Sequence, residues 1–513
     1  MKRDRVVLAW KLASVPAAEL EFKTADPILT EWADLPERER LAGIRPGQWF
    51  LLPADGVPDP DVIAFFRFSK INAKSKDTQR SYAHDLKVHL EFLGQKGTSW
   101  RAARPSDLDD YEFWRRRDPR NPNRISDSKF NRELAACRLF YDYQTRRGAI
   151  ARSPLLLQEY RRRDGSTGVT PELRAKARAS NDVKWLTPAA YRKWRRVGLA
   201  GYEPSDMPQE NWRGRNDGRN LAFAELLWSS GLRLREAATL LVPELPRAVD
   251  SRRYYRGKLA RSVAKGNHAR HYWVSSQALA MIDGYAISTR QAVIDRARAE
   301  GRYEAVPGRI LVTSLVGRSG VRIRTDRGRE GRATFAQLDE DERRLLFRET
   351  PEGLEPLALW LGDSGLPMRT SSWEAVFAAA NQRMTAFGIG TPAGPLHCRP
   401  HMLRHSFALR MLVTLQHVFD QRLGLTPEER KEYRLLFGDP WVLVAQLLGH
   451  RSIDTTRNIY LEPARGLQLE SLLNEGPEDA DDITALLSRL AEETLLVHDI
   501  TDAGAQSPED RDG

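Results

Sequence analysis

The segment that follows Pro400 constrains the fold of this chain more than any other part of the sequence. Leu403, Phe407 and Met411 stand at four-residue steps, a spacing that predicts an amphipathic helix with these side chains on its buried stripe. Pro400 comes just before them, where proline is tolerated as the first residue of a helix. The sequence therefore predicts a helix that begins at about residue 400.

His401 and Arg404 are three residues apart, so on this helix they share a face. In the first turn they would stand beside backbone N–H groups without a partner in the helix, at the positive end of its dipole. Such a helix start readily binds a phosphate group. Each residue taken alone is equally well explained as an ordinary surface side chain, so the pair needs support from the rest of the sequence.

A second segment supplies that support. Apolar residues over 441–448 predict a short helix that stops at Gly449 and leaves His450 in the following turn. Asp454 is placed to cap a further helix that carries Tyr460. One phosphate can therefore be reached from two sides, by the His/Arg pair and by the His450 turn with Tyr460.

The order of these residue types resembles the motifs of the tyrosine recombinases, the phage-integrase family. His-x-x-Arg-His stands at 401–405, Leu-Leu-Gly-His at 447–450, and Thr-Thr followed by Tyr at 455–460. Residue types, order and local spacing all agree. The resemblance implies that Tyr460 is the nucleophile on a DNA phosphate, that Arg404 and His450 contact that phosphate, and that His401 either takes the tyrosyl proton or assists the phosphoryl group.

Two upstream motifs extend the resemblance. The run at 231–236, Gly-Leu-Arg-Leu-Arg-Glu, is similar to the family's first arginine motif, with Arg233 as the active-site arginine and Glu236 as its acidic neighbour. Lys265 precedes a Gly-Asn dipeptide that is typical of a two-residue hairpin turn. The family carries a lysine at such a hairpin tip, where it protonates the leaving oxygen. Lys258 is the alternative, but the Lys-Gly-Asn match favours Lys265.

At 513 residues the chain is too long for one core. The fold expected is mainly α with a small β-sheet: a helical core-binding (SAM-like) domain followed by a mixed α/β tyrosine-recombinase catalytic domain. The expected parts are an N-terminal segment of unknown role at 1–55, the core-binding domain at 56–156, a basic linker at 157–184, the catalytic domain at 185–474 and an acidic tail at 475–513.

Two stretches of the catalytic domain depart from the family pattern and are interpreted as insertions, at about 300–356 and 415–440. The first is rich in arginine and has strand-like segments, so it is either an added DNA contact or a charged sheet edge that discourages aggregation. The second contains a charged segment with a helix-start pattern. The role of both insertions stays open.

The core-binding domain is a basic helical bundle by its own pattern, and the resemblance implies that it clamps one face of duplex DNA. Lys76, Arg80, Lys129 and Arg132 are its candidate DNA-binding residues. The cationic linker at 157–184 either lies along the phosphate backbone or is a solvated tether.

Charge is distributed unevenly along the chain. The net charge is +11, and residues 475–513 hold two arginines against twelve acidic residues, a balance of −10, so residues 1–474 carry +21. A large basic body points to a polyanionic partner, most commonly nucleic acid. The acidic tail either folds back over the basic groove of its own chain or docks on a neighbouring protomer.

Cysteine usage and hydropathy narrow the setting. Cys137 and Cys398 stand far apart, without metal-ligand spacing, which excludes a disulfide scaffold and a zinc module and fits a reducing cytosol. No run approaches the ~18 apolar residues that span a bilayer. We expect a protein of the cytoplasm, associated with the nucleoid, with no metal or other cofactor.

These observations predict a site-specific DNA recombinase, an integrase of a mobile element that cuts and rejoins strands through a 3′-phosphotyrosyl intermediate. The expected partners are double-stranded DNA attachment sites, a homotetramer assembled on DNA, and accessory DNA-bending or directionality factors. Two alternatives remain: a type IB topoisomerase-like DNA relaxer, and a catalytically silent DNA-binding regulator. Recombinant products separate the first alternative from the recombinase, and a covalent protein–DNA adduct separates the second.

Overall fold

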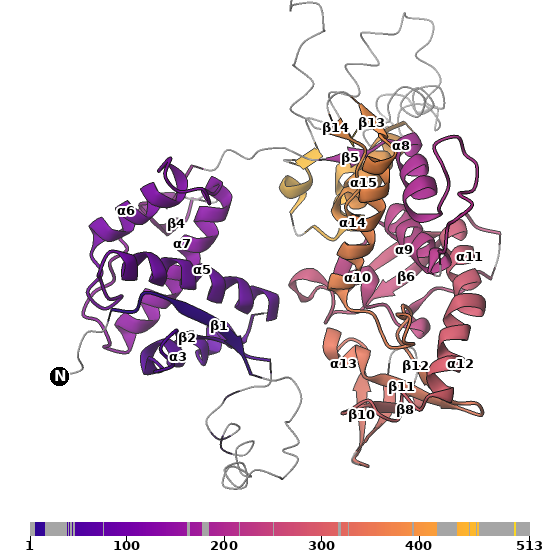
Figure 1. The fold of residues 1–513 in the computed structure, drawn as a ribbon, viewed down its shortest axis with the longest axis horizontal. Coiled ribbons are helices and arrows are strands. Elements are labelled where there is room, and N and C mark those ends of the chain that lie inside the picture. The colour runs from indigo at the N-terminus through magenta and orange to yellow at the C-terminus, as the bar shows by residue number, and fades with distance from the viewer. Residues whose placement is uncertain are drawn as a thin grey trace, which may run out of the picture. The chain divides into compact units, whose positions relative to one another are not determined.

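The computed structural model is mainly helical with small sheets, as the sequence predicted. It falls into two compact units, an N-terminal unit of residues 1–180 and a C-terminal unit of residues 181–513 (Figure 1). The residues that it describes are 6–15, 38, 41, 44, 47–74, 76–161, 165–176, 184–214, 216–249, 251–316, 320–326, 328–391, 394–417, 439–450, 452–457, 459–460 and 497–498.

The N-terminal unit is a helical bundle with two small hairpin sheets. Its elements are β1 (Trp10–Ser14), β2 (Trp49–Pro53), α3 (Pro60–Phe66), α4 (Ser69–Asn72), α5 (Lys76–Gln95), α6 (Pro105–Arg116), α7 (Asp127–Arg146), β3 (Leu157–Arg161) and β4 (Thr167–Pro171). Strands β1 and β2 pair antiparallel, and both pack against α5. The segment before residue 55, to which the sequence assigned no role, thus contributes Trp10 and Leu51 to the core of the bundle.

The stretch at 157–184 differs from the extended linker that its composition suggested. Its first part forms the antiparallel hairpin β3–β4. Beyond the hairpin, Ala175 is buried, and its backbone N–H and carbonyl both bond the side chain of Asn131, at 2.9 and 3.0 Å. These contacts with α7 tie the stretch to the N-terminal unit, an effect that the local run of arginines did not indicate.

The C-terminal unit is built around the buried helix α9. Its elements up to residue 300 are β5 (Trp185–Leu186), α8 (Pro188–Lys193), the π-helix η1 (Trp194–Leu199), α9 (Asp217–Ser230), α10 (Leu234–Ala238), η2 (Val242–Glu244), β6 (Tyr254–Leu259), η3 (Lys265–Asn267), β7 (Arg270–Ser275), α11 (Ser276–Tyr285), η4 (Ala286–Arg290) and α12 (Gln291–Ala299). Helices α11 and α15 and strand β7 all pack on α9. Phe223 of α9 stacks on Trp373, with ring centroids 3.5 Å apart.

The first insertion forms a five-stranded sheet in the order β10-β9-β8-β11-β12, and α12 packs on its strand β12. Its elements are β8 (Ile310–Val316), β9 (Gly320–Thr325), β10 (Glu330–Thr334), α13 (Glu340–Arg344), β11 (Leu346–Thr350) and β12 (Gly353–Pro356). Val312, Val321 and Leu346 bury one side of it against Leu241. On β9 and β10, Arg322 stands directly opposite Arg332.

The remaining elements carry the candidate site. They are α14 (Thr370–Ala386), β13 (Gly390–Thr391), β14 (Gly394–Pro395), α15 (Pro400–His417), α17 (Pro440–Leu448) and β15 (Val497–His498). Helix α15 begins at Pro400, as predicted, and α17 ends at Gly449, as predicted. Strand β15 pairs with β5 of the same chain. Most of the second insertion and most of the acidic tail lie outside the described residues.

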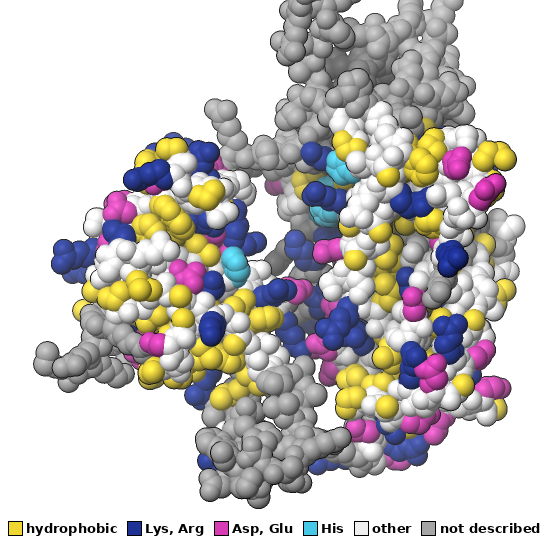
Figure 2. All heavy atoms as spheres, viewed as in Figure 1, with side chains coloured by type: hydrophobic (Ala, Val, Ile, Leu, Met, Phe, Trp, Pro, Cys, Tyr) yellow, Lys and Arg dark blue, Asp and Glu magenta, His cyan; other side chains and the backbone are white. Residues whose placement is uncertain are grey.

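No helix in the described part of the chain is long and apolar enough to cross a membrane. Over the visible face of each unit, Lys and Arg side chains are interspersed with Asp and Glu side chains (Figure 2). Cys137 and Cys398 are both buried and free.

Candidate active site

The carbonyl ends of two helices hold Arg404. Its side chain is 2 % exposed. Nη1 donates to the carbonyl oxygen of Gly231 and Nη2 to that of Leu448, each at 2.6 Å. These carbonyls lie at the ends of α9 and α17, where the helix dipole favours a cation. The guanidinium is therefore fixed in place, and it keeps further N–H donors for a ligand.

Glycine is required at both helix ends. Gly231 and Gly449 adopt left-handed backbone angles, with φ of 62° and 65°, which other residues adopt only at a cost. A Cβ atom at Gly231 would lie 2.3 Å from the ring of Phe407, and one at Gly449 would lie 2.6 Å from the side chain of Arg270. The two turns therefore bring α15 and β7 against the helix ends that hold Arg404.

Glu236 links two arginines. Arg233, the residue before α10, donates to it from its backbone N–H and from Nη1, both at 2.9 Å. Arg270, at the start of β7, donates to it from Nη1 and Nη2, at 2.9 and 2.5 Å. Burial opposes the charged carboxylate, but the hydrogen bond and charge of Arg270, with the charge of Arg233, lower the pKa of Glu236 to about 2. Arg235, two residues further on, pairs with Glu340 instead.

Tyr460 is buried, and its hydroxyl lies 2.7 Å from Nδ1 of His405. The ring of His405 stands edge-on to the rings of both Tyr460 and His401, with centroids 5.5 and 4.5 Å away. Burial raises the pKa of Tyr460 above its usual range, and the charges of Arg404 and Arg233 oppose that rise. Arg404 directly precedes His405 on α15, so it lies in the same helical turn as the histidine that contacts the phenol.

His450 lies in the turn after α17, and its Nδ1 is 2.8 Å from Oγ1 of Thr456. Burial, with the charges of four cations, lowers its pKa to about 4, so it is neutral at pH 7. These cations are Arg404, Arg233, Arg270 and Lys265.

The helix that carries Tyr460 starts differently from the prediction, because Ser452 rather than Asp454 caps it: the Ser452 hydroxyl accepts from the backbone N–H of Asp454.

Lys265 is exposed and lies on the connection between β6 and β7. Gly266 and Asn267 turn the chain as predicted, with φ of 75° and 58°. This turn does not join the strands directly, because the paired strands end at Leu259 and Arg270 and residues 260–269 connect them. Val263 in this connection is buried in the core. Lys265 nevertheless contributes to lowering the pKa of both His401 and His450, so its charge reaches the site.

The structure gathers five of the six predicted catalytic residues around the start of α15 and the ends of α9 and α17, together with the supporting Glu236: Arg233, His401, Arg404, His450 and Tyr460. Lys265 lies on the exposed connection between β6 and β7, and its charge alone links it to this site. His401 begins this face of α15. Partial desolvation of the ring is the largest cause that lowers the pKa of His401, and the charges of Arg404, Arg233 and Lys265 lower it further. On the visible face of the C-terminal unit, histidine side chains lie next to Lys and Arg side chains (Figure 2). The arrangement is cationic, which suits an anionic substrate.

Two residues of the site were not singled out from the sequence. His405 belongs to the quoted His-x-x-Arg-His motif, and its four-residue spacing from His401 puts both on one face of α15, so the signal was present. Arg270 carries no such signal, because only the pairing of β6 with β7 brings it to Glu236.

The candidate DNA-binding residues of the N-terminal unit are partly engaged by acids. Lys129 and Arg132 on α7 both pair with Asp85, which is fully buried. Arg80 lies over the ring of Trp49, 5.4 Å from its centroid. Lys76 is exposed at the start of α5. Asp85 thus holds Lys129 and Arg132, two of the four candidate cations, in place. The side chain of Arg132 is still half exposed on the surface of α7.

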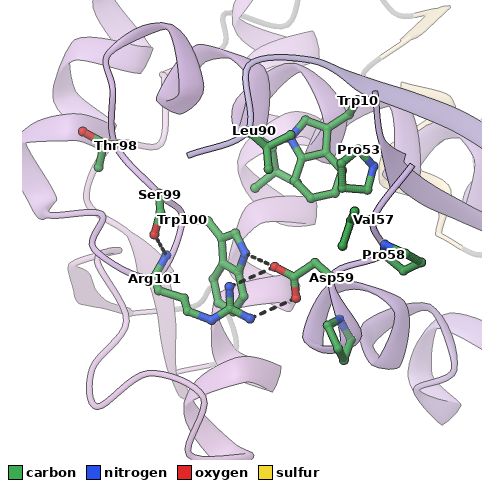
Figure 3. Close-up of a pocket in the computed structure, with 12 residues that line it drawn as sticks. Trp10, Pro53, Val57, Pro58, Asp59, Leu90, Thr98, Ser99, Trp100 and Arg101 are labelled. Carbon is green, nitrogen blue, oxygen red and sulfur yellow. Dashed lines mark hydrogen bonds and ion pairs between the residues drawn. The ribbon is translucent and has the colours of Figure 1, made fainter. Parts of the chain in front are cut away.

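The N-terminal unit also contains a cavity of about 300 Å³ between Trp10 and Trp100 (Figure 3). At its edge Asp59 accepts from the indole N–H of Trp100 at 3.0 Å and from both terminal nitrogens of Arg101 at 2.9 Å. The same carboxylate caps α3. This network caps and fixes the start of α3, and it involves none of the predicted site residues.

No group of His, Cys, Asp and Glu side chains among the described residues is arranged to hold a metal ion. The candidate site instead gathers arginine, lysine and histidine. Such groups bind and orient a phosphate, and a buried phenol beside them is a potential nucleophile.

Comparison with known proteins finds a family match in the N-terminal unit. Residues 62–148 match the family model of the phage integrase N-terminal SAM-like domain. This match confirms the resemblance to the tyrosine recombinase (phage integrase) family, and it falls within the helical core-binding domain expected from the sequence.

Solved structures similar to the chain include the XerH site-specific recombinase bound to palindromic difH substrate in a post-cleavage complex. That match has 13 % identity and a TM-score of 0.42, and it covers 90 % of this chain and 100 % of that one. The pre-cleavage complex of XerH has 13 % identity, a TM-score of 0.40 and coverages of 88 % and 99 %. The Tn1549 transposon integrase with circular intermediate DNA has 14 % identity, a TM-score of 0.33 and coverages of 75 % and 94 %. No curated protein matches the chain.

Proposed function

We propose that this protein is a site-specific DNA recombinase, an integrase of a mobile element that cuts and rejoins DNA through a 3′-phosphotyrosyl intermediate. The observation that supports this most is the position of Tyr460, whose buried phenol lies 2.7 Å from His405, the residue that follows Arg404 on α15. A nucleophile in a site with two guanidinium groups suits attack on an anionic phosphodiester.

Arg404 and Arg233 grip the two non-bridging oxygens of the scissile phosphate. Guanidinium groups match phosphate oxygens in charge and in hydrogen-bond geometry. Their own positions are set in advance, Arg404 by two helix-end carbonyls and Arg233 by Glu236. Two fixed cations supply the charge stabilisation that a metal ion provides in other phosphoryl-transfer sites, so the proposed reaction requires no metal or nucleotide cofactor.

Tyr460 attacks phosphorus, the bond to the 5′ oxygen breaks, and Lys265 gives a proton to that departing oxygen. His450, neutral at pH 7, hydrogen-bonds the phosphoryl group, and His401 assists at the opening of the site. The phosphotyrosyl link conserves the energy of the broken bond. A second 5′ hydroxyl then reverses the step and exchanges strands.

The proposed substrate is double-stranded DNA at attachment sites, bound by a homotetramer, with accessory DNA-bending or directionality factors. In the N-terminal unit, Lys76, Arg80, Lys129 and Arg132 are the proposed contacts to the DNA backbone. Salt-dependent binding is expected, because each phosphate contact releases counterions.

The test begins with duplexes selected from a random pool by binding to the full-length chain. The selected duplexes are nicked beside the centre, so that cleavage releases a short fragment and traps the adduct. We expect a protein–DNA adduct that survives boiling in detergent, and recombinant products from intact pairs of sites. Relaxation of plasmids without recombinants would indicate a topoisomerase-like relaxer instead, and binding without any adduct would indicate a silent regulator.

A further inference from the structure

The group that touches the nucleophile is His405. Its Nδ1 lies 2.7 Å from the phenol oxygen of Tyr460. His401, the first histidine of the motif, contacts His405 edge-on instead, with ring centroids 4.5 Å apart. The three rings therefore form a row from the opening of the site to the buried phenol, with His405 in the middle.

The direction of this hydrogen bond depends on which ring nitrogen of His405 carries the proton. His405 is neutral at pH 7, because burial, then the charges of His401, Arg404 and His450, lower its pKa to about 3. The phenol is also neutral, since its pKa is raised. With the ring proton on Nε2, the hydroxyl of Tyr460 donates and Nδ1 of His405 accepts, and this is the tautomer that the proton transfer proposed below requires.

We propose that His405, rather than His401, is the general base that removes the proton of Tyr460 during DNA cleavage. This assignment rests on the proposed function. As the bond from the Tyr460 oxygen to phosphorus forms, the phenolic proton moves to Nδ1 of His405. The bond from phosphorus to the 5′ oxygen breaks, and that oxygen keeps the electron pair and takes a proton from Lys265. In rejoining, His405 returns its proton to the departing phenol.

The charges around His405 explain why the proton moves only when substrate is present. The groups that face it are His401 and Arg404 from its own helix α15, His450 from the turn after α17, and Tyr460 itself. All the charges in this set are positive or zero while the site is empty. A phosphodiester held between Arg404 and Arg233 adds a negative charge, which increases the proton affinity of the ring.

Replacement of His405 by asparagine separates positioning from proton transfer. The asparagine amide can occupy the place of Nδ1 and accept the phenol's hydrogen bond, but it does not take up a proton at neutral pH. We expect His405→Asn to slow single-turnover adduct formation on the nicked duplex by on the order of 10²–10⁴-fold at pH 7. The rate should then rise about tenfold per pH unit as the phenol itself ionises.

Three comparisons make the test specific. His401→Asn should lower the rate without this steep pH dependence. A duplex with sulfur at the 5′ bridging position, a better leaving group, should rescue Lys265→Ala and leave His405→Asn slow. Incorporation of a fluorinated, more acidic tyrosine at position 460 should restore adduct formation in His405→Asn, which also shows that this variant is folded.

Each result decides between the two histidines. The proposal is overturned if His405→Asn keeps the wild-type rate and pH profile, if His401→Asn shows the steep pH dependence instead, or if the acidic tyrosine gives no rescue. Absence of any adduct with the wild-type chain would overturn the proposed function itself. A wild-type adduct with an unaffected His405→Asn would remove only the assignment of the base.

Discussion

Arg270 binds Glu236 through both terminal nitrogens of its guanidinium, at 2.9 and 2.5 Å. The carboxylate side chain is 1 % exposed, so it is charged in a place where only its arginine partners stabilise it. Through the same carboxylate Arg233 is held at the start of α10. A residue of β7 therefore positions an arginine proposed to bind phosphate, although 37 residues separate the two in sequence.

The first prediction concerns acid stability. The pKa of Glu236 is about 2 in the folded chain, below its unfolded value of about 4.3, so the unfolded state takes up its proton first. Its contribution, about 3 kcal/mol, is complete above pH 5 and is lost as the pH falls from about 4.5 to 2. Glu236→Gln should be less stable to heat than the wild type at pH 7, and this difference in stability should be smaller at pH 3. An equal gap at both pH values would contradict it.

The second prediction concerns Gly449. Gly449→Ala adds a Cβ atom 2.6 Å from the Arg270 side chain, at a residue with φ of +65°. Gly388→Ala is the matched control, since Gly388 has φ of +63° and nothing lies within 4 Å of its Cβ position. The control should lose about 1–2 kcal/mol of stability from backbone strain alone. Gly449→Ala should lose about 1 kcal/mol more in denaturant unfolding and should also slow adduct formation; equal losses would contradict the close approach.

The third prediction concerns the guanidinium of Arg404. Lysine at 404 cannot reach both helix-end carbonyls, so Arg404→Lys should slow adduct formation by about 10²–10³-fold. Arg410→Lys is the control, because Arg410 also lies on α15 and donates to a carbonyl of α9, that of Trp228, at 2.8 Å. It should perturb the same helix contact with adduct formation close to wild type. Equal activity losses in the two variants would argue that Arg404 is only structural.

The fourth prediction concerns the inserted sheet. Arg322 and Arg332 face each other across β9 and β10, and like charges in direct pairs are destabilising. Arg332→Glu should stabilise the pair by about 0.2–1 kcal/mol, visible as slower amide hydrogen exchange in β9 and β10. Arg329→Glu makes the same charge change outside the strands and should leave that exchange unchanged. Faster exchange in Arg332→Glu would contradict the pairing.

Local patterns account for the parts of this protein that the sequence predicted. The start of α15 at Pro400 and the ends of α9 and α17 at Gly231 and Gly449 follow from proline and glycine backbone preferences. Motif order was enough to name five residues that the fold gathers around the start of α15. These features depend on short stretches of chain, where residue type and spacing carry most of the information.

Long-range contacts account for what the sequence did not predict. The connection at 260–269 is longer than the Gly-Asn turn within it, and it buries Val263 in the core of the C-terminal unit. Trp10 and Leu51 pack on the N-terminal bundle from a two-stranded antiparallel sheet whose strands are far apart in sequence. The contact of His405 with Tyr460 spans 55 residues, so spacing indicated the face of α15 without naming its partner.

The central claim is that Tyr460 attacks DNA, and mapping the DNA-linked residue tests it most directly. The adduct trapped on the nicked duplex is digested with protease and nuclease, and the nucleotide-bearing peptide is sequenced by mass spectrometry. We predict a single modified peptide that carries a phosphodiester on Tyr460, absent from Tyr460→Phe. A nucleotide on any other residue, or an adduct that persists in Tyr460→Phe, would contradict the account.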